Sequence, residues 1–444
     1  MKTLLARLKE LRRYPSAVVG LFIIGILLIV SIYAVIAIPY PRAISLWKAT
    51  GDEWLENPRL ARPKWVNFLP GVNQPETVVV RTGQQGTKVV GADGKFTITL
   101  PFKYTYNGFP PEVTLFLTTK FRGYGPYVEM FWVTPEGEKI PLRKESLRGD
   151  YRYLLGADPT LRDYLGCSPL IGLFTTPPQR KTPTEAKPRQ GNYQVVIEGY
   201  VFEEGSDFDA KLVVYGRVHG WAGTDHLRRD LTLPLLWGTP IAFVFGLVAA
   251  VGISVAQFTL GAVSAWYGRS VDASLQFVTR VWMVLPALPI YIMVGMFFSK
   301  SIWAILMVVL ILGMFGGGVL NARSMFIQAK EAPYIEAARA YGAKNRRIIF
   351  RYLIPRVLPV LIPGFVNAIP GYVFLEASLS FLGLGDPSLP TWGKVLNESN
   401  IEALLQGHYH WVVQPALLLM VTGFAFALVG FALDRIFNPR LRTI

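Results

Sequence analysis

Residues 17–38 read AVVGLFIIGILLIVSIYAVIAI, an apolar run without a charged side chain. An α-helix needs about 20 consecutive apolar residues to cross the roughly 30 Å of hydrocarbon in a bilayer. A cleaved signal peptide would have a shorter apolar core, of about 7–15 residues, and a small-residue cleavage site. This run instead ends at Pro39 and Tyr40, and five cations precede it: Lys2, Arg7, Lys9, Arg12 and Arg13. We therefore interpret it as a membrane-spanning helix.

Five further apolar stretches follow a long polar segment. They cover about 235–262, 277–298, 302–320, 355–382 and 411–433. Hydrophobic residues make up 51% of the chain and charged residues only 17%, whereas soluble domains carry about 25% charged residues. The sequence thus predicts an all-α polytopic membrane bundle of six transmembrane helices.

The distribution of Lys and Arg predicts the orientation of the bundle. The net charge of +15 is compatible with either a nucleic-acid or a membrane partner. Cations gather in alternate short loops, above all in the loop between the fourth and fifth apolar stretches. This loop holds Arg323, Lys330, Arg339, Lys344, Arg346, Arg347 and Arg351. Such loops face the cytoplasm. We expect a plasma or inner membrane protein with both termini cytoplasmic, in contact with lipid and with no nucleic-acid partner.

The polar segment, residues 40–222, reads as a β-rich inserted domain on the outer side. Residues 95–100, KFTITL, alternate polar and apolar side chains, which is typical of a half-buried strand. Further strand candidates lie at about 77–81, 112–120, 127–133, 193–202 and 211–218. We expect a small sandwich or barrel there, with an irregular excursion at 175–189. The other predicted domains are 1–39, the cytoplasmic N-terminus and first helix, and 223–444, the core with five helices.

The segment between the fourth and fifth apolar stretches carries the strongest functional pattern, KEAPYIEAARAYG at 330–342. Pro333 suits the first turn of a helix, and Gly342 suits the left-handed residue that ends one. The residues between them are good helix formers. We expect a short capped helix on the cytoplasmic side whose small and charged residues suit docking: Glu336, Ala337, Ala338 and Arg339.

This segment resembles the Glu-Ala-Ala loop of ABC importer permeases. In that family three residues and a Gly follow Glu-Ala-Ala, and nine more residues precede Ile-x-Leu-Pro. The present chain matches at residues 336–338, Gly342 and Pro355, and it departs at Tyr352 and Ile354. A generic basic amphipathic loop is the alternative interpretation. The resemblance implies that this helix docks into a groove on an ATPase subunit, with the coupling loop at about 330–355.

Other motifs resemble the smaller-type permease of dipeptide and oligopeptide importers. That subgroup has Gly-Thr-Asp-x-x-Gly-Arg-Asp where residues 223–230 read GTDHLRRD, with Arg228 in place of the second Gly. Met283 stands where an Asp is usual, which puts any polar contact of that Asp in doubt. Further matching positions are Tyr267, Gly268, Val271, Asp272, Arg280, Pro289, 376–385 and 390–393. The inserted β-rich segment lies outside the resemblance.

The resemblance implies a subunit of an ATP-driven, binding-protein-dependent importer for peptides, which forms half of the translocation pathway. The implied partners are a second homologous permease, two ATPase subunits that bind ATP and Mg, and an extracytoplasmic solute-binding protein. The chain has no phosphate-binding Gly-rich loop ending in Gly-Lys-Ser/Thr. We therefore expect no enzyme activity, catalytic residue, cofactor or metal in this chain itself.

Two alternatives remain open at this stage. Within the same family, the solute is an oligosaccharide or a nickel complex. In a different class, the chain is a membrane-anchored receptor or sensor with an external β domain, although such a protein has no need of an ATPase-docking helix.

Four residues are candidates for gating or for the pathway. Glu376 lies late in an apolar stretch, where an ionisable residue is a functional candidate by default. Both a structural cap and a gate are compatible with its position near the outer interface. Pro289, Pro370 and Gly371 can interrupt helices inside a bundle, either as part of a pathway that opens and closes or as inert kinks.

Overall fold

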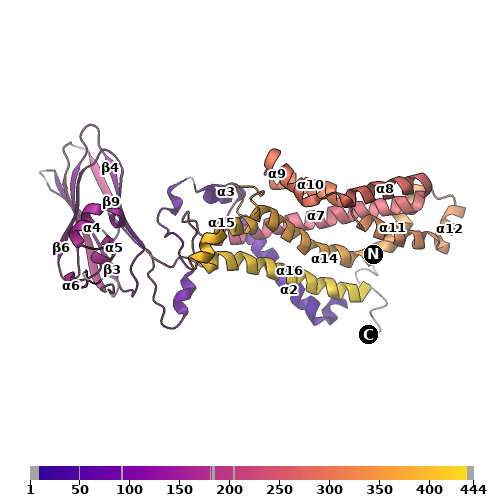
Figure 1. Cartoon of the computed structure of the whole chain (residues 1–444), viewed down its shortest axis with the longest axis horizontal. Helices are drawn as coiled ribbons and strands as arrows, with labels where there is room; N and C mark the ends of the chain where they lie inside the picture. Colours follow the sequence, from indigo (N-terminus) through magenta and orange to yellow (C-terminus); the bar gives the residue numbers. More distant parts are fainter. Residues whose placement is uncertain are drawn as a thin grey trace. The chain divides into compact units, whose positions relative to one another are not determined.

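The computed structural model divides the chain into two compact units (Figure 1). The helical unit comprises Met1–Lys48 and Leu233–Ile444, and the β unit comprises Ala49–Thr232. The structure describes residues 10–49, 51–91, 94–180, 182, 186–203 and 206–437. The predicted cytoplasmic ends at residues 1–9 and 438–444 lie outside the described residues.

The helical unit is a bundle of long apolar helices with short helices at their ends. Four helical stretches are long and apolar enough to cross a membrane: Pro15–Ala37, Thr232–Tyr267, Asn345–Phe381 and Tyr409–Phe437. Two bent helix pairs bring the number of possible spans among the described residues to six. The predicted helical membrane domain is confirmed, with four to six candidate spans. Its elements are η1 (Glu10–Arg13), α2 (Pro15–Ala37), α3 (Tyr40–Lys48), α7 (Thr232–Tyr267), α8 (Arg269–Val284), α9 (Ala287–Phe297), α10 (Ile302–Met314), α11 (Gly318–Lys330), α12 (Pro333–Ala340), α13 (Asn345–Arg347), the π-helical η5 (Ile348–Leu353), α14 (Ile354–Phe381), α15 (Trp392–Leu405) and α16 (Tyr409–Phe437).

The third and fourth apolar stretches are bent, which their hydrophobic pattern did not predict. The axes of α8 and α9 differ by 73°, and those of α10 and α11 by 44°. The first bend falls at Leu285, whose ψ of 128° is typical of a residue that precedes proline. At the second bend the Gln257 side chain of α7 donates a hydrogen bond to the Gly313 carbonyl at 2.7 Å. This bond satisfies a carbonyl beside the break, as irregular backbone within a membrane requires.

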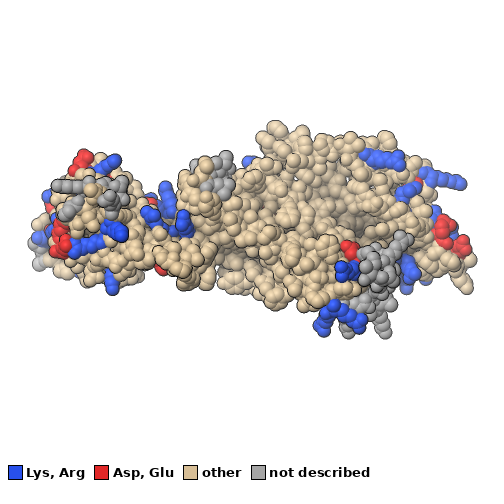
Figure 2. All heavy atoms as spheres, turned by 60° about the horizontal axis from the view of Figure 1, so that its bottom comes forward, with Lys and Arg blue, Asp and Glu red and all other residues tan. Residues whose placement is uncertain are grey.

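Small residues bring the helices close together. A Cβ atom on Gly20 of α2 would lie 2.6 Å from the Ala425 carbonyl oxygen of α16, so these two helices touch through backbone, as small residues permit in membranes. Figure 1 shows α2 and α16 side by side. On the face shown in Figure 2 the long middle part of the helical unit is free of charged side chains, which gather at its right-hand end. This distribution is the one expected of a bundle in lipid.

The β unit is an antiparallel sandwich. One sheet has the order β1-β9-β4-β7 and the other β2-β3-β8-β5-β6. The Phe96 ring of β3 lies 5.0 Å from the Phe208 ring of β9, so the two sheets share one core. The strands are β1 (Val78–Arg81), β2 (Thr87–Val90), β3 (Lys95–Tyr104), β4 (Glu112–Lys120), β5 (Tyr127–Val133), β6 (Lys139–Ser146), β7 (Tyr151–Leu154), β8 (Gly191–Tyr200) and β9 (Asp207–Tyr215). The predicted β-rich segment is confirmed, and β2, β6 and β7 are additional strands.

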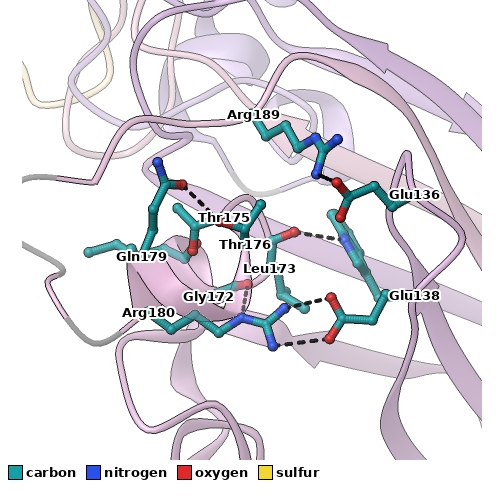
Figure 3. A network of polar contacts seen from close by, with 11 residues as sticks. Glu136, Glu138, Gly172, Leu173, Thr175, Thr176, Gln179, Arg180 and Arg189 are labelled. Atoms are coloured by element: carbon teal, nitrogen blue, oxygen red, sulfur yellow. Dashed lines mark hydrogen bonds and ion pairs between the residues drawn. The ribbon is translucent and has the colours of Figure 1, made fainter.

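Short helices complete this unit, and Leu161, Leu165, Leu173 and Phe174, between β7 and β8, belong to its apolar core. Figure 3 shows the polar contacts of this segment. The Arg180 guanidinium donates to both carboxylate oxygens of Glu138 at 3.1 Å and to the Gly172 carbonyl at 3.0 Å. The buried Trp132 indole donates to the Leu173 carbonyl at 3.1 Å. The described part of the predicted excursion is therefore tied to the β5–β6 turn. The short helices are η2 (Asp52–Trp54), η3 (Lys64–Phe68), η4 (Leu155–Ala157), α4 (Pro159–Leu165), α5 (Pro169–Gly172) and α6 (Pro177–Arg180).

Candidate functional site

The predicted capped helix is present as α12. Pro333 occupies its first turn, and the preceding Ala332 has an extended conformation. At the other end Gly342 has a φ of +74° and its amide donates to the Arg339 carbonyl at 2.9 Å. The Ala343 amide reaches the Ala338 carbonyl at 3.0 Å. These bonds satisfy carbonyls that would otherwise be unpaired at the end of the helix.

Helix α12 has one buried face and one exposed face. Ile335 is fully buried in an apolar cluster with Phe326 of α11 and Ile348 of η5. The opposite face is open, and it consists of Glu336, Ala337, Ala340 and, just past the helix, Tyr341, which is 91% exposed. The helix is thus held through its Ile335 face and presents small side chains and one carboxylate to the outside.

Two cations contact the end of α7, Arg339 from α12 and Lys330 from the last turn of α11. The Arg339 guanidinium lies 4.6 Å from the centre of the Trp266 ring, within the range of a cation–π interaction. The Lys330 ammonium donates to the Ala265 and Trp266 carbonyls at 3.1 and 3.0 Å. Positive charge is favourable at the C-terminal end of a helix. The Arg339 side chain thus links α12 to the end of α7.

A second polar cluster joins α7, α8 and α11 near the same place. The Asp272 carboxylate forms a bidentate pair with Arg323, both contacts at 2.5 Å. It also accepts hydrogen bonds from Ser264 at 2.5 Å and Gln276 at 2.9 Å. Bidentate Arg–carboxylate pairs fix geometry as well as adding energy. From the sequence alone Arg323 was only a topology signal, and Asp272 was only a position that matches the permease subgroup.

The structure brings together some of the predicted coupling residues and separates one. Glu336, Ala337, Ala338 and Arg339 lie on α12, and Gly342 closes it. Pro355 instead lies in the first turn of α14, beyond α13 and η5. Its helix nevertheless joins the same cluster, because Leu353 and Val357 on either side of Pro355 belong to the apolar core that holds Ile335.

The candidate gate residue lies in a separate place. Glu376 of α14 is buried, and its carboxylate accepts a hydrogen bond from Ser380 at 2.8 Å. The Thr391 side chain also hydrogen-bonds to it. Next to Thr391, the Trp392 indole donates to the Leu235 carbonyl at 3.0 Å. The described contacts of Glu376 therefore belong to a junction of α14, α15 and α7.

The three remaining candidates lie on helix breaks and open surfaces. Pro289 is exposed in the first turn of α9, directly after the 73° bend. Pro370 and Gly371 lie inside α14, and no atom would come within 4 Å of a Cβ on Gly371. A cavity of about 380 Å³ lies between α7, α11 and α14, and none of these three candidates lines it. Its polar lining includes Ser254, Gln257, Asn321 and Tyr372.

Comparison with known proteins was informative for the helical unit. Residues 257–443 match the model of a family described as binding-protein-dependent transport system inner membrane component. The chain is 29% identical over 223 residues to the dipeptide transport system permease protein DppC of Bacillus subtilis, covering 50% of this chain and 69% of that protein. It is 29% identical over 224 residues to the oligopeptide transport system permease protein OppC of the same organism, with 50% and 72% covered. It is 30% identical over 221 residues to the probable peptide ABC transporter permease protein y4tQ of Sinorhizobium fredii, with 50% and 75% covered.

Proposed function

The chain belongs to the inner membrane components of binding-protein-dependent transport systems, as a permease of the peptide ABC importer type, and from this premise we propose that it forms half of an ATP-driven pathway for peptides across a cell membrane. The partners in this proposal are a second permease, two ATPase subunits and an extracytoplasmic solute-binding protein. The single observation that carries the proposal is α12, whose outward face is free while its inner face is held in the helical unit.

In this proposal α12 is the contact for an ATPase subunit. Ala337 and Ala340 allow a groove to approach the helix closely, and Glu336 supplies a charge for a polar contact. ATP binding would close the ATPases and displace α12. Because Arg339 and Lys330 connect this region to the end of α7, the displacement would reach the spans. Two states of the bundle would then be stabilised differently, which is what alternating access requires.

The proposed topology places α12 and both termini in the cytoplasm and the β unit outside. The basic residues near α12 support this, because Lys and Arg are enriched in cytoplasmic loops. Lys344, Arg346, Arg347 and Arg351 are all exposed there. A position of α12 on the outside, found by labelling of single cysteines at 333–342 in intact cells, would contradict the proposal.

The proposed substrates are short peptides. Relatives carry names for dipeptide, oligopeptide and glutathione transport, and these solutes share a peptide backbone. The cavity between α7, α11 and α14 offers amide and hydroxyl groups from Gln257, Asn321 and Tyr372, which can hydrogen-bond such a backbone. These residues are our candidates for contact with a peptide in transit.

Co-purification tests the coupling role. The Glu336→Lys substitution reverses the charge on the outward face of α12, whereas Glu331→Lys makes the same change on the exposed residue that ends α11. We expect the wild type and Glu331→Lys to retain the ATPase subunit through purification, and Glu336→Lys to lose most of it. Peptide uptake should fall in parallel. If the two variants retain equal amounts of ATPase, α12 is not the contact, and a wild-type chain that holds no ATPase returns the question to a receptor or sensor.

A further inference from the structure

The β unit has a group of exposed apolar side chains at its base, which we define as residues 49–77 and 216–232, where the chain enters and leaves the unit. Trp65 is 44% exposed, Phe68 85%, Leu69 52% and Trp221 79%. The Trp65 indole donates to the Trp221 carbonyl at 3.1 Å, so two distant segments form one surface. Trp65 and Phe68 lie three residues apart in the 3₁₀-helix η3, which places their side chains on one side. These four residues are the apolar base patch.

The loop that carries Phe68 and Leu69 is held rigidly and has no charge. Residues 65–75 read WVNFLPGVNQP. The Asn67 side chain donates to the Gln74 carbonyl at 3.0 Å, and the Gln74 amide donates back to the Asn67 side chain at 3.0 Å. These two bonds close the neck of the loop. The apolar side chains of this loop are therefore exposed on an ordered surface. Exposed apolar patches of this kind mark interaction sites.

Backbone bonds connect the patch to the start of a membrane span. The Lys64 amide donates to the Gly220 carbonyl at 2.9 Å, next to Trp221. The Leu231 amide donates to the Gly223 carbonyl at 3.0 Å. Leu231 directly precedes α7, one of the helices long and apolar enough to cross a membrane. Trp221 is therefore two residues from Gly223, whose carbonyl is bonded to the residue that precedes α7.

The chemistry of the surrounding side chains fits the lipid interface. Indole rings are amphipathic and are enriched at the headgroup level of membranes. Arg59 and Arg62 are exposed in the segment that precedes Trp65, and their side chains form no hydrogen bond or ion pair within the described part of the chain. Guanidinium groups without a protein partner can pair with lipid phosphates.

We propose that the apolar base patch inserts into the headgroup region of the leaflet that faces the β unit. Trp65 and Trp221 lie at headgroup level, Phe68 and Leu69 reach the upper acyl chains, and Arg59 and Arg62 bind phosphates. The lipid surface then orients the β unit. This role is independent of peptide transport and goes beyond the proposed function.

Lipid quenching in the full chain tests the proposal. In a Cys167→Ser background, which removes the one cysteine of the chain, a bimane label is attached at Phe68→Cys, Pro70→Cys or Trp221→Cys. The matched control is Tyr124→Cys, since Tyr124 is also exposed, at 75%. Its amide donates a hydrogen bond to Glu203, which precedes β9, whereas Trp221 follows β9. The control is therefore associated with the other end of that strand. The labelled chains are placed in nanodiscs of phosphatidylcholine with a doxyl-labelled fraction.

We expect quenching at residues 68 and 70 to exceed that at residue 124 by at least about threefold, since interfacial segments are buried about 5–10 Å deep. Equal quenching at all positions would overturn the proposal. So would quenching that disappears when the chain is assembled with its partner permease, because the patch would then be a protein interface. The readout is lipid contact, so a failure of transport would challenge the proposed function without affecting this result.

Discussion

Arg228 is the residue that departs most clearly from the motif of related permeases, and the structure explains how it is tolerated. Its φ is +67°, a conformation that costs an L-residue roughly 1–2 kcal/mol and that Gly adopts freely. Arg228 therefore occupies a left-handed position that would suit the Gly of the motif it resembles. The guanidinium compensates by donating to the Asn57 carbonyl at 2.7 Å and to Glu112 at 2.6 Å, above the Tyr215 ring.

Two substitutions at this residue separate strain from contacts. Arg228→Gly and Arg228→Ala both remove the guanidinium contacts. The positive φ at this position is strained for Ala but not for Gly. We expect both variants to unfold at lower temperature than the wild type, and the Ala variant to be less stable than the Gly variant by about 1 kcal/mol. Thermal unfolding in detergent, followed by tryptophan fluorescence, measures the difference. An Ala variant as stable as the Gly variant would show that this turn is not strained.

The pair of Asp272 and Arg323 permits a second prediction at this scale. Their side chains are 15% and 27% exposed and contact each other at 2.5 Å, so each substitution alone leaves the other group partly buried without its partner. We expect Asp272→Asn and Arg323→Gln to destabilise the helical unit individually. Combined, they should cost less than the sum, with a coupling free energy of about 0.5–3 kcal/mol.

The control for this comparison of single and double variants is Arg280→Gln, and the unfolding temperature is measured for each variant. Arg280 also carries a cation on α8, but it is exposed, and within the described residues its side chain has one hydrogen bond, to Gln276 at 3.1 Å. That substitution should change stability little. Strict additivity of Asp272→Asn and Arg323→Gln would contradict the view that this pair holds α8 against α11.

Among the elements, α12 depends on its C-terminal glycine. Gly342 has a φ of +74°, and no atom would lie within 4 Å of a Cβ added there, so the penalty for another residue is conformational only. We expect Gly342→Ala to fray the end of α12 at a cost of about 1 kcal/mol, and to weaken ATPase retention during purification. Gly25→Ala makes the same change inside α2 in equally open space, where Ala is favoured. Equal ATPase retention in both variants and the wild type would refute this.

Local signals explain why α12 could be predicted from sequence while its support could not. Pro333 and Gly342 define the ends of the helix by their own backbone preferences. By contrast, Asp272 and Arg323 are 51 residues apart, and nothing local pairs them. The bends of the third and fourth spans escaped prediction for a similar reason. Pro286 in the third stretch and the glycines at 316–318 in the fourth permit either a kink or a break, and packing decides which of them occurs.

The strands illustrate the same limit. Residues 95–100 alternate cleanly, because one side chain in two faces the core. Strands β2 and β7 have only four residues each, too few for a period to be recognised. Edge strand β6 reads KIPLRKES, and its charges and proline are typical of an edge that resists aggregation, so they conceal the pattern.

At the scale of the whole molecule, the two units have separate cores. The apolar core of the β unit runs from Val80 to Val214, whereas the clusters around α12 and the long helices come from the helical unit alone. The ends of the insertion are close together in the helical unit: the Trp237 indole of α7 donates to the Ile38 carbonyl at 3.1 Å, just past α2. A flexible Gly/Ser linker can therefore replace residues 49–231 without removing a core residue of the bundle.

This replacement separates the roles of the two units, since we expect the β unit to dock the solute-binding protein or the outer face of the partner permease. The shortened chain should still retain the ATPase subunit, because α12, its Arg339–Trp266 contact and the apolar cluster around Ile335 remain complete. Its affinity for the binding protein and its peptide uptake should both fall. ATPase retention serves as the folding control, measured on the same preparation as binding-protein affinity. Unchanged docking and uptake would reduce the β unit to a stabilising cap, whereas loss of the ATPase as well would mean that the bundle requires the β unit in order to fold.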